Sequence, residues 1–312
     1  MNGKRYYWRS ALLTLLLVSI AAAGCSTVTA YKAPLTNYRD ANTIVVESAR
    51  TFITQANQVE REDYIDSQVR SHSEIDFLKM EQTQILTPDQ IENRIKALES
   101  LSEYGTLLVK IANSDAPQDI SDKAKNISTD LNNLAKAVNA LHGGEDLPFK
   151  TTVDPAINII GQVAKSAMEK KIQEALDKAV SSGYDPIMNL IDLVSNDASV
   201  AYQRQRSYLS AQRKYAWEDY NGEAEKGKDA KADVLKKDAD QLKAVLVKWD
   251  ELPQTNPEKL FGAMREAQRA LLAYAGSRKT SKDVEDFTDA MTKYLERVKE
   301  VEAALKKLSG AK

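Results

Sequence analysis

Apolar residues recur at alternating steps of four and three positions through most of the chain after residue 37. Similar runs begin at Val45 and Val284, and one complete run is Ile120, Ala124, Ile127, Leu131, Leu134, Val138 and Leu141. An average spacing of 3.5 residues places an apolar stripe along one side of an α-helix and suits helices packed at shallow angles. Alternation with a period of two is not sustained. The pattern predicts an all-α fold, an antiparallel multi-helix bundle with long, coiled-coil-like helices.

Prolines and glycines divide this pattern into separate helices. Thr87-Pro88-Asp89-Gln90 combines a cap residue, a first-turn proline and a capping-box glutamine, and Asp154-Pro155, Asp185-Pro186 and Asn256-Pro257 repeat the cap-then-proline order. Gly183 is expected to end a helix in the left-handed conformation. The predicted helices cover residues 37–68, 88–113, 121–141, 155–182, 186–220, 229–250, 257–275 and 281–308, with a less regular piece at 72–85.

Two features of this division stay open. Asn221-Gly222 either breaks the helix that begins at Pro186 or only bends it. The segments 87–141 and 257–308 align without gaps over their apolar positions, which is compatible with a duplication. Any two amphipathic hairpins with loops of equal length would align in the same way.

A different pattern occupies the first 25 residues. Three basic residues precede an apolar stretch at 11–20, which is followed by small residues at 21–24 and by Cys25, the only cysteine of the chain. A positive segment, a short apolar segment and a run of small residues are the three parts of a secretory signal peptide.

The residues Ala22-Ala23-Gly24-Cys25 resemble the lipobox of bacterial lipoprotein precursors, in which a signal peptidase cuts before a lipid-modified cysteine. The resemblance implies cleavage in the region of Ala22, Ala23 and Gly24 and acylation of Cys25, with palmitate among the acyl chains. It departs from the preferred pattern at Ala22, where leucine is usual. In Gram-negative lipoproteins a residue other than aspartate after the cysteine, here Ser26, implies sorting to the outer membrane.

Two other interpretations of the amino terminus remain open. An ordinary signal peptide ending at Ala21-Ala22-Ala23 would leave Cys25 as a free thiol. Residues 10–31 could instead remain as a signal anchor, although their apolar core is shorter than the roughly 20 residues that cross a bilayer. The lipoprotein interpretation divides the chain into a signal peptide at 1–24, an acylated tether at 25–36 and a helical-bundle domain at 37–312, with a possible subdivision near 144–154.

Composition argues against most enzyme classes. One cysteine and two histidines are too few for a thiolate zinc site, a histidine-based metal centre or a catalytic triad. The chain has no phosphate-binding glycine motif, no H-E-x-x-H and no G-x-S-x-G. Its 45 acidic residues make carboxylate pairs on one helix face unavoidable, so such pairs do not identify a catalyst. We therefore expect no enzymatic activity, no catalytic residue, no metal and no cofactor.

One predicted helix carries an unusual mixture of aromatic and basic residues. Between residues 187 and 215 an aliphatic stripe gives way to tyrosines, and the neighbouring stripe changes from apolar residues to glutamines. A helix whose apolar face ends partway along its length is expected to leave the core there. The candidate partner surface consists of Tyr202, Arg204, Arg206, Tyr208, Arg213, Tyr215 and Trp217. The plainer alternative is that the tyrosines cover one end of the bundle while the basic residues are solvated.

The net charge of the chain and its expected export together limit the classes of partner that we expect. Removal of residues 1–24 takes away three basic residues and no acidic one, so the remaining chain is mildly acidic and does not favour nucleic acid. We expect an outer-membrane-anchored periplasmic lipoprotein that acts as a non-enzymatic binding or scaffolding module and contacts an envelope protein. The alternatives are an exclusion or anti-phage lipoprotein that blocks a surface receptor or an entry step, and a hydrolase of envelope polymers.

Overall fold

The structure is a computed structural model that describes residues 29–114 and 165–309. Helices account for all regular structure in these two ranges, which contain no strand, so the predicted all-α bundle is confirmed. The elements are α2 (Thr29–Ser71), α3 (Phe77–Gln82), α4 (Pro88–Ala112), α6 (Lys165–Ala224), the 3-10 turn η1 (Gly227–Asp229), α7 (Ala232–Glu251), the 3-10 turn η2 (Leu252–Thr255), α8 (Pro257–Gly276) and α9 (Ser281–Ser309). The helix predicted at 121–141 lies outside the described residues, and so does about half of the aligned segment 87–141.

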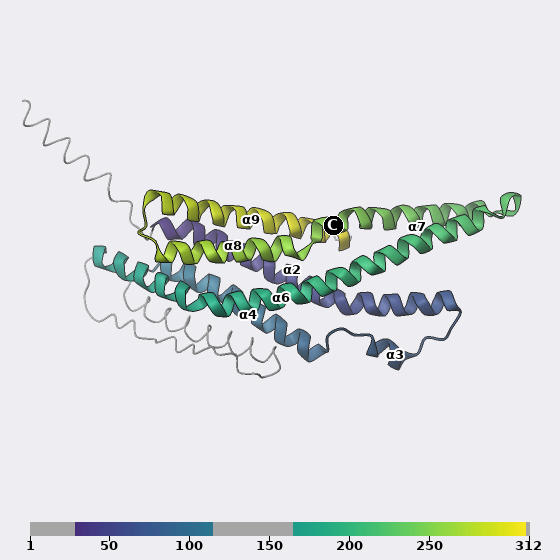
Figure 1. Cartoon of the computed structure of the whole chain (residues 1–312), viewed down its shortest axis with the longest axis horizontal. Helices are drawn as coiled ribbons and strands as arrows, with labels where there is room; N and C mark the ends of the chain where they lie inside the picture. Colours follow the sequence, from purple (N-terminus) through teal and green to yellow (C-terminus); the bar gives the residue numbers. More distant parts are fainter. Residues whose placement is uncertain (1–28, 115–164, 310–312) are drawn as a thin grey trace, which may run out of the picture.

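Helices α2, α4, α6, α8 and α9 form the bundle (Figure 1). α2 packs against α4, α6 and α9, while α4 and α8 both contact α6. α2 and α4 run in opposite directions, as do α8 and α9. α6 contains 60 residues, which corresponds to a length of about 90 Å. Its first half lies in the bundle against α8, and its second half pairs with α7 in a helical hairpin that extends from the bundle (Figure 1).

The caps predicted at two helix starts are confirmed. At the start of α4, the amide of Gln90 donates to Oγ1 of Thr87 over 3.3 Å, and the amide of Thr87 donates to Oε1 of Gln90 over 2.9 Å. At the start of α8, Oδ1 of Asn256 accepts a hydrogen bond from the Glu258 amide. These side chains satisfy amide groups that have no partner inside the helix.

The prediction that residues 29–36 belong to an irregular tether is wrong. They are helical, because α2 begins at Thr29 rather than near residue 37. Tyr31, Leu35 and Tyr38 are fully buried and continue the four-three spacing of the α2 stripe towards the amino terminus. Pro34 lies inside this helix. A proline in a helix interior costs about 3 kcal/mol, and the packing of the buried neighbours on both sides of Pro34 offsets that cost.

The predicted helix boundary at Gly183 and Pro186 is also wrong, because α6 runs through both residues without interruption. Pro186 and Gly183 lie on the buried side of the helix, and Ile187 and Leu190 directly after them are fully buried. Burial of such side chains contributes roughly 1.5–3 kcal/mol each, so packing outweighs the local preference for a break. Asn221-Gly222 lies within α6 as well.

The segment between α2 and α4 is exposed at first and contacts α2 again just before α4 begins. The irregular piece predicted at 72–85 contains only the short helix α3, none of whose residues is buried. Asn57, a buried residue of α2, then holds the chain before α4. Its Oδ1 accepts hydrogen bonds from the amides of Ile85 and Leu86, and its Nδ2 donates to the carbonyl of Leu86 over 2.6 Å.

We expect Asn57→Ala to destabilise the protein by about 1–3 kcal/mol, because the amide of Leu86 would remain buried without an acceptor. Urea denaturation followed by circular dichroism measures this free energy of unfolding. Gln58→Ala is the matched control, since its side chain is exposed and donates to Glu62; it should change stability by less than about 0.5 kcal/mol. Equal effects of the two substitutions would contradict the role assigned to Asn57.

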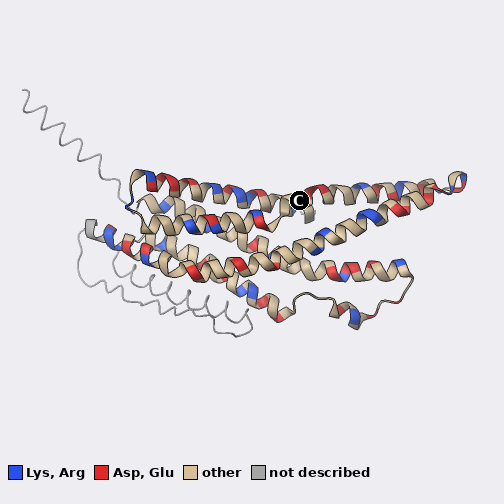
Figure 2. Ribbon diagram, viewed as in Figure 1, with Lys and Arg blue, Asp and Glu red and all other residues tan. Residues whose placement is uncertain are grey.

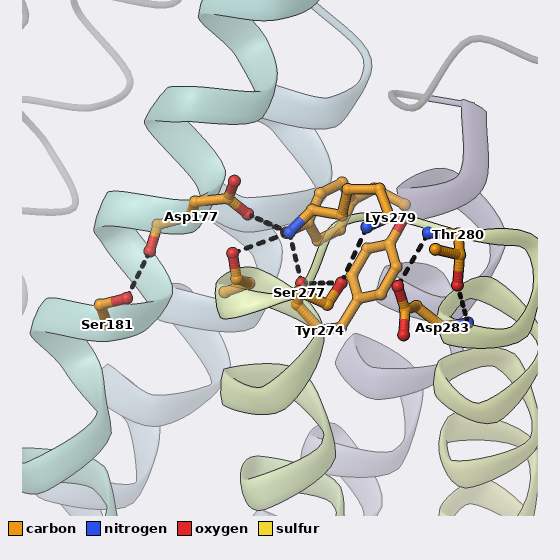
Figure 3. A network of polar contacts seen from close by, with 9 residues as sticks. Asp177, Ser181, Tyr274, Ser277, Lys279, Thr280 and Asp283 are labelled. Carbon is orange, nitrogen blue, oxygen red and sulfur yellow. Dashed lines mark hydrogen bonds and ion pairs between the residues drawn. The ribbon is translucent and has the colours of Figure 1, made fainter.

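A buried lysine joins three helices at the end of the bundle where α2 begins (Figure 3). Lys279 lies in the turn between α8 and α9, and its side chain is only 3% exposed. Its Nζ donates to the carbonyl oxygens of Tyr274 and Ala275 and lies 3.1 Å from Oδ1 of Asp177 on α6. The same carboxylate oxygen accepts a hydrogen bond from Oη of Tyr31 on α2. We call Tyr31, Asp177 and Lys279 the end node.

Aromatic rings enclose the end node. The ring of Tyr31 meets that of Tyr274 edge-on, with centroids 4.8 Å apart, and Tyr274 stacks on Phe287 at 4.5 Å. Burial, followed by the hydrogen bond to Asp177, raises the pKa of Tyr31 above its usual range. Burial and the Asp177 carboxylate raise the pKa of Tyr274 to about 12. Both hydroxyl groups therefore remain protonated at neutral pH, which keeps Tyr31 a hydrogen-bond donor.

Candidate functional site

The residues assigned to lipidation and sorting lie outside the described part of the chain. They are Ala22, Ala23, Gly24, Cys25 and Ser26. Only three residues separate Cys25 from Thr29, and four peptide steps cannot exceed about 14 Å in any conformation. A lipid on Cys25 would therefore lie close to the end node. Within residues 29–114 and 165–309, no helix combines the length and the apolar content needed to cross a membrane.

The structure divides the candidate partner surface between two sides of α6. One side faces the carboxyl-terminal half of α2. Arg204 forms an ion pair with Glu60 at 3.2 Å, and Oη of Tyr208 donates to Asp66 over 3.1 Å. The guanidinium of Arg70 on α2 lies 3.7 Å from the ring centroid of Tyr215. These contacts hold α6 against α2.

Two further details concern this α2-facing side. Burial, together with the nearby Asp66 carboxylate, raises the pKa of Tyr208 above its usual range, so its hydroxyl stays a donor. Tyr202 lines a cavity of only about 10 Å³ together with Phe52 of α2 and Leu305 of α9. These tyrosines therefore connect helices of the described fold.

The other side of α6 forms a groove with α7. The groove has a volume of about 1070 Å³ and contains Arg206, Arg213 and Trp217 from the candidate surface. We call it the α6–α7 groove; its lining residues are Gln203, Arg206, Ser207, Ser210, Ala211, Arg213, Lys214, Trp217, Leu242, Leu246 and Trp249. At 100° per residue, those from α6 lie on nearly the opposite side of the helix from the residues that contact α2.

Three lining residues on α7 were missed by the sequence analysis. Leu242, Leu246 and Trp249 follow the four-three spacing, but many charged residues lie between them along α7. Charged residues of both signs are interspersed along α7 (Figure 2). None of its residues is buried. The alternation of charge and the short apolar stripe together were the available signal for a groove on this helix.

Both walls of the groove carry partly exposed side chains, and one contact connects the walls. Trp217 is 57% exposed, and Leu246 is 39% exposed. The guanidinium of Arg213 lies 4.3 Å from the ring centroid of Trp249 and so connects α6 to α7. No described carboxylate, histidine or cysteine lines the groove, whereas three cations do. The groove therefore offers apolar contact and positive charge, without an acid–base pair.

The tip of the hairpin is held by a buried carboxylate. Glu223 accepts hydrogen bonds from the amide of Lys231 at the start of α7 over 2.7 Å and from Nζ of Lys226. These donors lower the pKa of Glu223. Gly227 has φ of +59°, a backbone conformation that costs other residues about 1–2 kcal/mol. Asn221-Gly222, where a break or a bend was left open, lies inside α6, and the turn of the hairpin follows at Gly227.

The rest of the described surface gives little sign of reaction chemistry. No group of three or more histidine, cysteine or acidic residues within the described ranges is placed to hold a metal ion. A second cavity, of about 420 Å³, lies between α8 and α9 and is lined by both acidic and basic side chains. His72 is exposed at the end of α2 with φ of +53°, and His142 lies outside the described residues.

No protein-family model, no curated protein and no solved structure matches this chain.

The division of the candidate surface predicts different effects for two substitutions. Tyr208→Phe removes the hydrogen bond to Asp66 and should destabilise the protein by about 1 kcal/mol. Trp217→Ala removes a largely exposed ring and should change stability by less than about 0.5 kcal/mol. Chemical denaturation measures both values. A larger loss for Trp217→Ala than for Tyr208→Phe would contradict the assignment of these residues to a free and a packed side of α6.

Proposed function

We propose that this protein is a lipoprotein anchored through Cys25 in the outer membrane, facing the periplasm, and that it acts as a non-enzymatic binding or scaffolding module of the cell envelope. In this proposal the hairpin of α6 and α7 is the arm that engages an envelope protein. The lipobox-like sequence supports the anchor, and the groove supports the binding role.

One observation carries the proposal. The start of α2, next to Cys25, and the tip of the α6–α7 hairpin lie at opposite ends of the molecule (Figure 1). From Asp177 in the end node to Ala224 near the tip, α6 extends about 70 Å. A membrane anchor at one end and an exposed apolar groove on the remote arm form an arrangement suited to reaching a partner away from the bilayer.

The lining of the groove supports binding rather than turnover. Acid–base or nucleophilic catalysis requires paired titratable groups within hydrogen-bond distance of each other. The described lining residues supply cations, hydroxyl groups, an amide and apolar side chains instead. Exposed apolar surface with a polar rim is typical of protein interaction sites.

We expect Cys25→Ser to abolish incorporation of radiolabelled palmitate in a Gram-negative host, because the serine hydroxyl cannot take the thioether-linked lipid, and to leave the precursor uncleaved. Ser26→Asp is the matched control. It should retain labelling but shift the protein from the outer to the inner membrane in a sucrose gradient.

Two results would overturn this proposal. Palmitate incorporation into Cys25→Ser would refute the lipidation site, and recovery of the wild-type protein from the cytosol would refute the location. Protease digestion of the protein on intact cells would point instead to a surface-exposed exclusion or anti-phage lipoprotein.

A further inference from the structure

We infer that the α6–α7 groove binds the apolar face of an acidic amphipathic helix from a partner protein, so that the partner helix packs against both α6 and α7. The inference rests on the proposed function, because it names the class of partner that the arm takes.

The spacing of the groove walls fits a helix. On α6 the wall follows residues 203, 207, 210, 214 and 217, and on α7 it follows residues 242, 246 and 249. Both walls advance by four and three positions, which is the seam that a third helix with the same repeat can enter. The wall on α6 is about 21 Å long, so it accommodates roughly four turns of a bound helix.

The sizes of the lining side chains also suit a helix. Ser207, Ser210 and Ala211 are small and leave room for a helix to approach α6 closely. Trp217, Leu246 and Trp249 are large and can hold an apolar anchor side chain. α7 contacts mainly α6 and has no buried residue. A partner helix would therefore cover apolar side chains that α6 and α7 leave partly in water.

The charge of the groove selects an acidic partner. Arg206, Arg213 and Lys214 line it, and none of its described lining residues is acidic. Arg206 forms no ion pair with a described residue, and Lys214 reaches only Glu218, at 3.6 Å. Carboxylates flanking the apolar stripe of a partner helix would complement these cations. An anionic membrane surface fits less well, because the arm outside the groove carries charges of both signs (Figure 2).

The groove contains its own optical reporters. The chain has three tryptophans, and two of them, Trp217 and Trp249, line the groove. The third, Trp8, lies in the segment assigned to the signal peptide. Tryptophan emission from the processed protein therefore reports on the groove, and it should shift to shorter wavelength when a helix excludes water from these rings.

The test uses the processed protein purified from membranes and reconstituted in phosphatidylcholine nanodiscs. The probe is a designed peptide of about 21 residues, three heptads, with leucine at positions a and d and glutamate at e and g. A second peptide carries lysine in place of glutamate. The glutamate peptide should give a saturable blue shift, and the lysine peptide should bind at least about tenfold more weakly. Added salt should weaken binding of the glutamate peptide.

Variants locate the binding site. Leu246→Asp and Arg206→Glu should each weaken binding of the glutamate peptide by about tenfold or more, because they place negative charge in the groove. Val247→Asp is the matched control. Val247 is 63% exposed on the same helix but does not line the groove, so binding should stay within about twofold of the wild-type value. Circular dichroism verifies that each variant keeps its helix content.

Three outcomes would overturn the inference. The glutamate peptide could give no saturable shift, or the lysine peptide could bind equally well. Phosphatidylglycerol vesicles could produce the shift without peptide, which would identify a lipid surface. The protein could self-associate in a manner abolished by Leu246→Asp, which would identify a second copy as the occupant. Palmitate labelling of Cys25 tests the proposed function separately, since none of these binding results alters it.

Discussion

The end node of Tyr31, Asp177 and Lys279 determines how the bundle is joined to its amino terminus. A buried ammonium group is tolerated only when its hydrogen bonds are satisfied, and Lys279 meets this requirement with two carbonyl oxygens and a carboxylate. The carboxylate also accepts the Tyr31 hydroxyl. The first turn of α2 is thereby fixed to α6 and to the α8–α9 turn, so a lipid on Cys25 would be joined to the rigid bundle by a linker of only three residues.

The same geometry explains how the arm is supported. α2 and α6 both begin near the end node and extend away from it (Figure 1). Contacts such as the ion pair of Arg204 with Glu60 hold the second half of α6 against α2 after α6 has left the core. On the other side α7 covers α6 incompletely, which leaves the groove open. The seven residues of the candidate partner surface thus serve two roles, support of the arm and formation of the groove.

The sequence predicts the fold class well because long apolar stripes dominate it. The starts of α4 and α8 also follow from local cap chemistry. Local signals failed where packing opposed them: Pro34, Gly183 and Pro186 lie inside helices because buried neighbours offset their cost. The Tyr31–Leu35–Tyr38 spacing was a signal for the earlier start of α2. The groove could not be predicted from α6 alone, since most of its apolar lining comes from the highly charged α7.

If Cys25 carries the proposed lipid, the arm points away from the membrane, and energy transfer to acceptor lipids tests this arrangement directly. Cys25 is the only native cysteine, so one introduced cysteine gives a single dye position in the lipidated protein. A dye on Arg278→Cys, beside the end node, should transfer strongly to acceptor lipids in a nanodisc. A dye on Lys228→Cys, at the tip about 70 Å farther along α6, should transfer weakly. Equal transfer from both positions would contradict the account.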